Sequence, residues 1–336
     1  VLRWEKTSRP FLRHREFLWQ EGHTLHATPE EAIAETEQQL ETYANLCENI
    51  LAMPVIRGQK TDKEKFAGAE RTYTIECMMH DRKALQAGTS HYFGDGFPTA
   101  FDITFTDKNN QQTHPFETSW GLSTRIIGGI IMTHGDNNGL VLPPRIAPIQ
   151  VIILPIAAHK PGVTEAAEQL VERLKNQGLR AKGDFSDNSP GWKFAEYEMK
   201  GVPLRIEIGP RDLEKGQCCL VRRDNGEKIV LSLDELEAKV PELLDAVHDG
   251  LYAKAAKNVA DHTYAAYSLE EAKQLQEEHG GFIKTMWCGN LQCELDMKEK
   301  AGMTSRCIPF QQEHLSDVCP ICGKKAEKMV YWGVAY

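Results

Sequence analysis

The hydrophobic pattern of the chain changes at the proline pair 143–144, and this change most constrains the fold. Before the pair, residues 101–120 alternate apolar and polar side chains around a turn at 109–110, which is typical of an antiparallel hairpin. From residue 149 onward, strand-like and helix-like segments alternate regularly. That order predicts a compact α/β domain with a mostly parallel sheet. The chain therefore contains more than one kind of domain.

The first part of the chain predicts an α+β domain over residues 1–147. Residues 1–27 are expected to form strands joined by a basic loop. Thr28 as N-cap, Pro29 at the first helical position and Glu31 completing a capping box then predict a helix that ends at about Met53.

Two further domains are expected, over residues 148–262 and 263–336. In the first, the Asn225-Gly226 pair predicts a hairpin and Ser232 with Glu235 a helix start. In the second, a helix with Ser268 as its cap precedes a segment rich in cysteine. We expect this last domain to be a small α/β unit.

Composition limits the class of protein. The 336 residues carry 41% hydrophobic and 26% charged side chains, as soluble proteins do, and the apolar stretch 146–158 is too short to cross a bilayer. We expect no signal peptide, no membrane partner and a cytoplasmic location. A net charge of −9 argues against indiscriminate binding of polyanions, but local basic patches leave a nucleic-acid partner open.

Five of the nine cysteines lie at the C-terminal end, which indicates a metal site there. Cys288 and Cys293 form C-x4-C, and Cys319 and Cys322 form C-x2-C, a spacing that suits structural tetrahedral zinc. A metal-free domain or a redox C-x2-C remains the alternative. We expect the fifth thiol, Cys307, to be packed and not a ligand.

Arginines, aromatic rings and carboxylates crowd the first 21 residues. Arg3 and Glu5 alternate on one strand face, and Arg13 with Glu16 repeats the combination. Surface ion pairing is the common explanation, but guanidinium groups also match phosphate oxygens in bidentate geometry. The combination favours a nucleotide site, and no GxxxxGK[ST] loop offers another one.

These segments together resemble a known family. VLRWE, a basic loop and FLRHREFLWQEGH resemble motif 2 of the class II aminoacyl-tRNA synthetases, and GDNNGLVLPPR resembles motif 3. KTDKEKFAGA, LQAGTSHYFG and TSWGLSTR resemble prolyl-tRNA synthetases of the archaeal and eukaryotic type. The resemblance implies part of an antiparallel class II catalytic domain, then an anticodon-binding domain and a C-terminal zinc-binding-like domain. It also implies a ligase that activates L-proline with ATP and Mg²⁺ and charges tRNA(Pro).

The resemblance also implies site residues. Two arginines, Arg3 and Arg145, would be catalytic. ATP would be bound by Arg3, Arg13, Glu16, Phe17, Gln86, Thr89, Arg125 and Arg145. The proline pocket would be formed by Trp19, Glu21, Phe66, His91 and Ser119. The anticodon would be read by Glu198, Arg205 and Arg211, whose side chains suit guanine.

Several alternatives stay open. His91 could be a buried, hydrogen-bonded histidine without a substrate, and Glu198 part of a solvated helix face. His23 and His26 lie at H-x-x-H spacing, but a strand would send them to opposite faces, so a metal role is not expected. Motif 1, the homodimer interface of the family, is absent from this sequence, so we expect residues upstream of Val1. The rival functions are another class II synthetase, such as the threonyl enzyme, and a non-catalytic tRNA-binding fragment.

Overall fold

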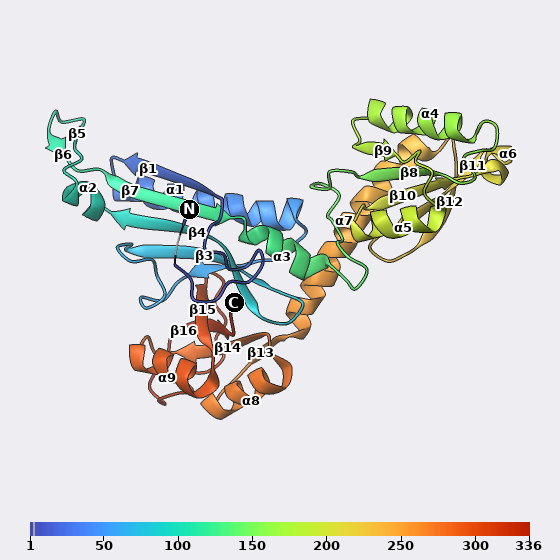
Figure 1. The fold of residues 1–336 in the computed structure, drawn as a ribbon. Helices are drawn as coiled ribbons and strands as arrows, with labels where there is room; N and C mark the ends of the chain where they lie inside the picture. The colour runs from blue at the N-terminus through green and yellow to red at the C-terminus, as the bar shows by residue number, and fades with distance from the viewer. Residues whose placement is uncertain (3) are drawn as a thin grey trace. The chain divides into compact units, whose positions relative to one another are not determined.

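The computed structural model describes residues 1–2 and 4–336, and the chain folds into two compact units (Figure 1). The first unit comprises residues 1–48, 53–133 and 256–336, and the second comprises residues 49–52 and 134–255. Arg3, predicted to hold ATP, lies outside the described residues. Within those residues, every helix is too short or too polar to cross a membrane.

A nine-stranded sheet forms the first unit, in the order β1-β7-β4-β3-β2-β15-β16-β14-β13. Its neighbours are antiparallel except the pair β13 and β14, as the predicted α+β class requires. The strands are β1 (Trp19–His26), β2 (Ile56–Gln59), β3 (Arg71–Met78), β4 (Ala84–Gly94), β7 (Phe116–Ser123), β13 (Thr263–Ala265), β14 (Phe282–Trp287), β15 (Thr304–Pro309) and β16 (Lys328–Gly333). The sheet therefore continues from the N-terminal part into the C-terminal segment.

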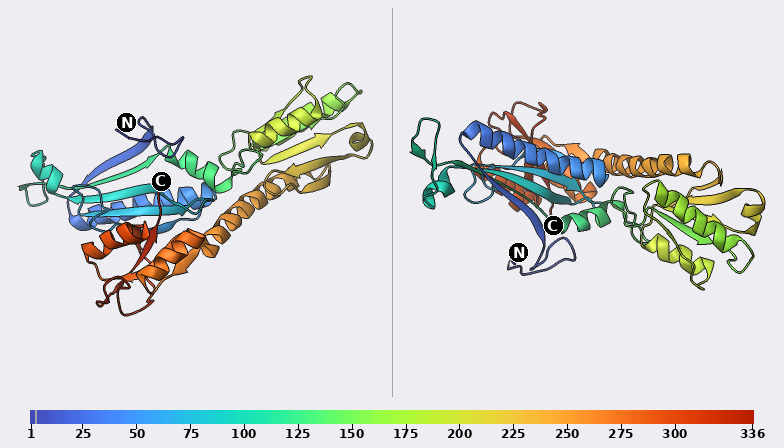
Figure 2. Two further views of the ribbon diagram at one scale, coloured as in Figure 1. Left: turned by 60° about the horizontal axis from the view of Figure 1, so that its bottom comes forward. Right: turned by 90° about the horizontal axis from the view of Figure 1, so that it is seen from above.

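Helix α1 (Pro29–Asn45) runs across one face of this sheet (Figure 2). Thr28 caps it as predicted, since its Oγ1 accepts from Glu31 N at 3.3 Å. A π-helical turn, η1 (Leu46–Ile50), ends the segment three residues before the expected Met53. Tyr43 of α1 packs against Gly88 and donates to the side chain of Gln20, so the opposite sheet face is left for a site.

Shorter elements complete the first unit. They are α2 (Gly96–Ala100), β5 (Phe105–Thr106), β6 (Gln112–Thr113), α3 (Arg125–His134), α8 (Leu269–His279) and α9 (Leu291–Ala301). The hairpin of β5 and β6 turns at residues 109–110, as predicted. Ser268 caps α8, also as predicted, by accepting from Glu271 N at 3.0 Å.

The N-terminal hairpin pairs more sparsely than the sequence predicts. The chain doubles back through the bridges Leu2–Glu16 and Arg9–Arg13 and through a 2.9 Å bond from the Val1 amino group to Phe17 O. No continuous strand is assigned in the described part of residues 1–18. The expected strands there are therefore reduced to a few cross-chain contacts.

The second unit is a five-stranded sheet in the order β12-β11-β10-β8-β9. Its strands are β8 (Val151–Pro155), β9 (Ala181–Gly183), β10 (Leu204–Ile208), β11 (Gln217–Arg222) and β12 (Lys228–Ser232), and its helices are α4 (Val163–Asn176), α5 (Pro190–Met199), α6 (Pro210–Glu214) and most of α7 (Leu236–Asp261). Strands β9, β8 and β10 are parallel, whereas β11 and β12 form the predicted hairpin at Asn225-Gly226. The sheet is thus parallel in three strands only.

Alternation along β8 places the core of this unit on both sheet faces. Val151 and Ile153 pack with α4 and α7, while Ile152 and Leu154 pack with Tyr197 of α5. Helix α7 begins at Leu236, four residues after the predicted cap Ser232. The Ser232 hydroxyl instead accepts from Asp234 N at 3.3 Å, so it stabilises a turn ahead of the helix.

Candidate active site

A cavity of about 460 Å³ opens on the face of the first sheet opposite α1. Its floor is formed by β1, β7 and β4, whose register sets His23, Ser119 and His91 in one row and Glu21, Gly121 and Thr89 in the next. Nine residues predicted for the ATP and proline sites line this one cavity: Phe17, Trp19, Glu21, Phe66, Gln86, Thr89, His91, Ser119 and Arg125. Segments far apart in sequence therefore converge on one site.

A β-bulge in β4 brings Gln86 to this cavity. Ile75 pairs with Gly88 but Glu76 pairs with Gln86, so Ala87 is an extra residue. Side chains alternate along a regular strand, which would put Gln86 and Thr89 on opposite faces. The extra residue switches the alternation and lets both line the cavity.

His91 is a buried, neutral wall of the cavity. It is 9% exposed, and its Nδ1 and Nε2 lie 3.0 and 3.1 Å from the hydroxyls of Thr72 and Thr89. Burial lowers its pKa to about 4, so the ring carries no charge at neutral pH. His91 thus combines the two alternatives left open by the sequence, because it is hydrogen-bonded in the core and also faces the cavity.

Aromatic rings form the apolar side of the cavity. Phe66 lies 5.0 Å from the His91 ring and 5.9 Å from Phe93, between ring centroids, and Phe93 packs on Phe97 at 5.0 Å. Phe17 and Trp19 form a separate edge-to-face pair at 6.0 Å. Such walls bury a small apolar ring while the sheet supplies polar groups below it.

Carboxylates supply the negative charge of the site. Glu21 and Glu117 both line the cavity and lie 3.4 and 3.7 Å from the two ring nitrogens of His23. Glu117 and His23 were not predicted, although alternation from Ser119 and Glu21 would have found them. His26 instead contacts the Thr24 hydroxyl at 2.7 Å, so the two histidines diverge as expected.

Three other predicted ATP residues are not among those lining this cavity. Arg13 pairs with Glu5 at 2.6 Å across the N-terminal hairpin, not with its sequence neighbour Glu16. Glu16 is exposed beside the bridge to Leu2. Arg145 is exposed in the second unit, where its guanidinium donates to Asn49 O.

Ion-paired arginines line a second cavity, in the second unit and also of about 460 Å³. Arg205 contacts Glu207 at 2.9 Å, Arg222 contacts Asp224 at 2.8 Å, and Arg223 contacts Asp136 at 2.7 Å. The predicted anticodon residues Glu198 and Arg205 line this cavity, and Glu198 accepts from Asn138 Nδ2 at 3.0 Å. The third, Arg211, is exposed on α6 and is not among the lining residues.

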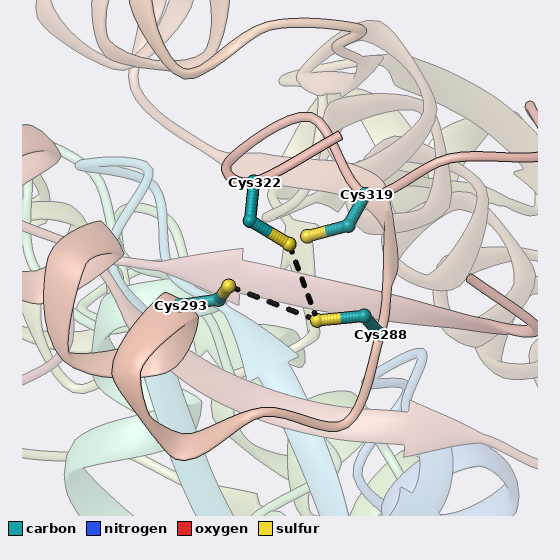
Figure 3. A group of neighbouring side chains, drawn as sticks. All are labelled: Cys288, Cys293, Cys319 and Cys322. Carbon is teal, nitrogen blue, oxygen red and sulfur yellow. Dashed lines mark hydrogen bonds between the residues drawn. The ribbon is translucent and has the colours of Figure 1, made fainter. Parts of the chain in front are cut away.

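The four predicted metal ligands come together at the start of α9 and in the knuckle before β16 (Figure 3). All four sulfur atoms of Cys288, Cys293, Cys319 and Cys322 lie within 4.8 Å of one another, with Cys288 Sγ at 3.7 Å from Cys293 Sγ and 3.6 Å from Cys322 Sγ. Zinc–sulfur bonds of about 2.3 Å in a tetrahedron give sulfur–sulfur edges of about 3.8 Å, so the donor set fits zinc. Cys307 is buried outside this group.

Three family models cover most of the chain. Residues 1–134 match the tRNA synthetase class II core domain (G, H, P, S and T), residues 150–243 the anticodon binding domain, and residues 269–336 the C-terminal domain of prolyl-tRNA synthetase. The proline–tRNA ligase of Clostridium novyi (strain NT) is 60% identical over 336 residues, which are 100% of this chain and 70% of that protein. The chain belongs to the prolyl-tRNA synthetase family.

Other prolyl-tRNA synthetases agree with this assignment. Proline–tRNA ligase 2 of Bacillus thuringiensis (strain Al Hakam) is 57% identical over the same residues and the same 70% of its length. The crystal structure of the prolyl-tRNA synthetase from Cryptosporidium parvum, complexed with L-proline and AMP, matches with a TM-score of 0.96 and 39% identity, covering 100% of this chain and 71% of that one. The predicted fold class and the prediction of a proline–tRNA ligase are therefore confirmed.

Proposed function

We propose that the chain activates L-proline with ATP and transfers the prolyl group to the terminal ribose of tRNA(Pro). The observation that carries this proposal is the convergence of nine predicted residues on one cavity with an apolar aromatic side and an acidic floor. The pyrrolidine ring of proline needs an apolar wall, and its secondary ammonium group needs an acidic acceptor. The family assignment supports the same substrate.

The amino-acid part of the site would bind proline as a zwitterion. Phe66 and the neutral ring of His91 provide a wall that adds no positive charge beside the ammonium group, and Trp19 and Ser119 line the same cavity. Glu21 and Glu117 provide acceptors. The free carboxylate of proline then attacks the α-phosphorus of ATP in line, the bond to the bridging oxygen breaks, and pyrophosphate leaves with the electron pair.

The nucleotide part would use Phe17, Gln86, Thr89 and Arg125 around the base and the ribose phosphate. Arg125 is held in place because its Nε donates to Leu12 O at 3.0 Å. The roles of Arg3, Arg13, Glu16 and Arg145 remain proposals taken from the family motifs. Mg²⁺, when bound with ATP, would neutralise phosphate charge, and arginines would stabilise the charge that develops at the α-phosphate.

The polar cavity of the second unit is the proposed anticodon site. Arginine and glutamate side chains match the edge groups of guanine, and Arg205 also stacks 4.2 Å above the ring centroid of Phe194. Arg211 lies beyond this cavity and would reach a third nucleotide. The domain division at residues 147 and 262 stays part of the proposal and is supported by the limits of the three family matches.

We also propose that the four clustered cysteines hold one structural zinc ion. A closed set of four thiolates leaves no open position for catalysis. Metal analysis of the purified chain should find about one zinc per chain, and Cys319→Ser should lower that content and the melting temperature together. A fully folded, metal-free chain would contradict the zinc proposal.

We propose three further properties of the chain. The archaeal and eukaryotic-like type is supported by the quoted motifs and by the similarity to the Cryptosporidium enzyme. Homodimerisation, carried over from the family, is tested by analytical ultracentrifugation. The cytoplasmic location stays a prediction of the sequence.

Amino-acid-dependent ATP–pyrophosphate exchange tests the proposed function. Exchange should require L-proline, with threonine and the other amino acids inactive. Exchange with threonine but not with proline would favour the rival class II synthetase. Binding of tRNA without any exchange would favour the non-catalytic fragment.

A further inference from the structure

Three charged side chains are buried together where the C-terminal segment meets the catalytic part of the sheet. Glu76 of β3 is 1% exposed, Lys60 after β2 is 5% exposed and Arg306 of β15 is 6% exposed. Lys60 Nζ donates to Glu76 Oε1 at 2.7 Å, and Arg306 donates to Glu76 Oε2 from Nε at 2.9 Å and from Nη2 at 2.8 Å. Buried charges persist in proteins when they are paired and hydrogen-bonded in this way.

A second buried group adjoins the first through the chain itself. Glu294 of α9 accepts from Thr61 Oγ1 at 2.7 Å and from Ser305 Oγ at 2.5 Å. Thr61 follows Lys60, and Ser305 precedes Arg306, so the two groups form one network with two cations and two carboxylates. Glu294 also follows Cys293 directly, which links the network to the cysteine cluster.

Strands β2 and β15 meet at this boundary over a short length. Strands β2 and β15 share only two register pairs, Gln59 with Ile308 and Gly58 with Pro309. Gly58 permits their close approach, because a Cβ there would lie 2.5 Å from Ile308 O and 2.8 Å from Cys307 Sγ. The buried side chains therefore add to a short backbone connection, which also includes a 3.2 Å bond from Phe310 N to Arg57 O.

The network is connected to two residues that line the active-site cavity, Gln86 and Phe66. Glu76 pairs in register with Gln86, next to the extra residue that turns Gln86 toward the cavity. Thr61 begins the turn that carries Phe66, since Lys65 N donates to Thr61 O at 2.9 Å. Glu76 is thus the strand partner of one residue that lines the cavity, and Thr61 lies in the turn just before another.

We propose that Glu76, Arg306 and Glu294 are positioning residues through which the C-terminal segment holds Gln86 and Phe66 in place for ATP and proline. This inference rests on the proposed function of the cavity. The C-terminal segment would then contribute to amino-acid activation without touching a substrate. Its buried contacts fix the strand and the loop that carry the substrate-binding groups.

Arg306→Met is the informative variant. It leaves Glu76 paired with Lys60, whereas removing Glu76 would leave two buried cations without their carboxylate and endanger folding. Arg306→Lys restores the charge but not the two-bond geometry. Glu313→Gln is the matched control, because Glu313 forms the half-exposed pair with Lys284 at 2.6 Å in the same segment.

The full chain and these variants should be compared for KM and kcat in proline-dependent exchange, for the Kd of Mg-ATP, and for zinc content. Arg306→Met should raise the KM of ATP and proline about five-fold with kcat changed less, as for residues that act through intervening contacts. Arg306→Lys should recover part of this loss, and Glu313→Gln should change nothing. A variant that melts cooperatively and keeps both KM values, or one that loses kcat alone, would overturn the inference.

Failure of the network and failure of the proposed function give different results. If the wild-type chain binds Mg-ATP but exchanges no pyrophosphate, the proposed function fails, while the Kd ratio of Arg306→Met to wild type still tests the network. If Arg306→Met does not fold, Thr61→Val replaces it, because this change of similar volume removes the hydroxyl that donates to Glu294. Unchanged KM and Kd values in Thr61→Val would then overturn the inference.

Discussion

Two cavities of the chain have the same size and opposite chemistry. Each measures about 460 Å³. The cavity of the first unit has aromatic walls, a histidine that burial keeps neutral, and carboxylates on its floor. The cavity of the second unit is lined by arginines that already have carboxylate partners, and Arg223 lowers the pKa of Asp136 to about 2.

Because of this difference, the two cavities would accept their ligands in different ways. A small zwitterion that enters the first cavity would meet the apolar wall on one side and, on the other, the carboxylates of Glu21 and Glu117, which lie 3.4 and 3.7 Å from the ring nitrogens of His23. A base that enters the second cavity would have to replace a carboxylate as the partner of a guanidinium group. The ion pair of Arg205 with Glu207 is an example. In the proposed function, the first site would select its ligand by shape and charge, and the second by replacing the carboxylate partners of its arginines.

The largest expected effect is on the pH dependence of the unfolding free energy, and it comes from the neutral ring of His91. Its pKa falls from 6.5 to about 4 in the folded chain, so the folded state resists protonation and stability is lost as pH falls from about 6.5 to about 4. The shift corresponds to about 3 kcal/mol. His91→Asn should remove that part of the acid slope when unfolding free energy is measured at pH 7 and pH 4.5. An unchanged slope would show that His91 titrates normally and that the first cavity can become cationic.

Glu21→Gln removes one carboxylate from the first cavity and leaves the second cavity unaltered. Loss of a charged acceptor should raise the KM of proline about thirty-fold, since hydrogen bonds to charged groups contribute about 1.5–3 kcal/mol. The Kd of tRNA(Pro) should stay within about two-fold, because the variant leaves the second unit unaltered. Exchange kinetics and a filter-binding assay give the two values. A parallel loss of proline and tRNA binding would contradict separate roles for the two cavities.

Arg205→Met makes the reciprocal change in the second cavity. It should weaken tRNA(Pro) binding about ten-fold, in the range of one lost bidentate base contact. Proline-dependent exchange, which needs no tRNA, should be unaffected. A control variant, Lys257→Met, removes an exposed cation from α7 whose partner is Asp261 at 2.7 Å. Equal weakening by both substitutions would indicate a general charge effect and not base recognition.

Local signals in the sequence were sufficient for some elements. Thr28 and Ser268 each sit one residue before a helix because their hydroxyls satisfy otherwise free backbone amides, a rule that operates within four residues. The cysteine spacing likewise predicted which four thiols would meet. Such features depend on short-range chemistry and can be found without a structure.

Features set by distant pairing could not be predicted. The bulge at Ala87 appears only when β4 meets β3, so alternation alone misplaces Gln86. The choice of Glu5 over Glu16 as partner of Arg13 depends on how the N-terminal hairpin closes. The junction of β2 with β15 joins residues about 250 positions apart, and no local pattern encodes it.

The most direct test is calorimetric titration of L-proline into the full chain with Mg²⁺ and a non-hydrolysable ATP analogue, at pH 7. We predict one proline site per chain, strongly weakened in Glu21→Gln and retained in Arg205→Met. Proline binding that survives Glu21→Gln unchanged, or that disappears in Arg205→Met, would contradict the assignment of the amino acid to the aromatic cavity.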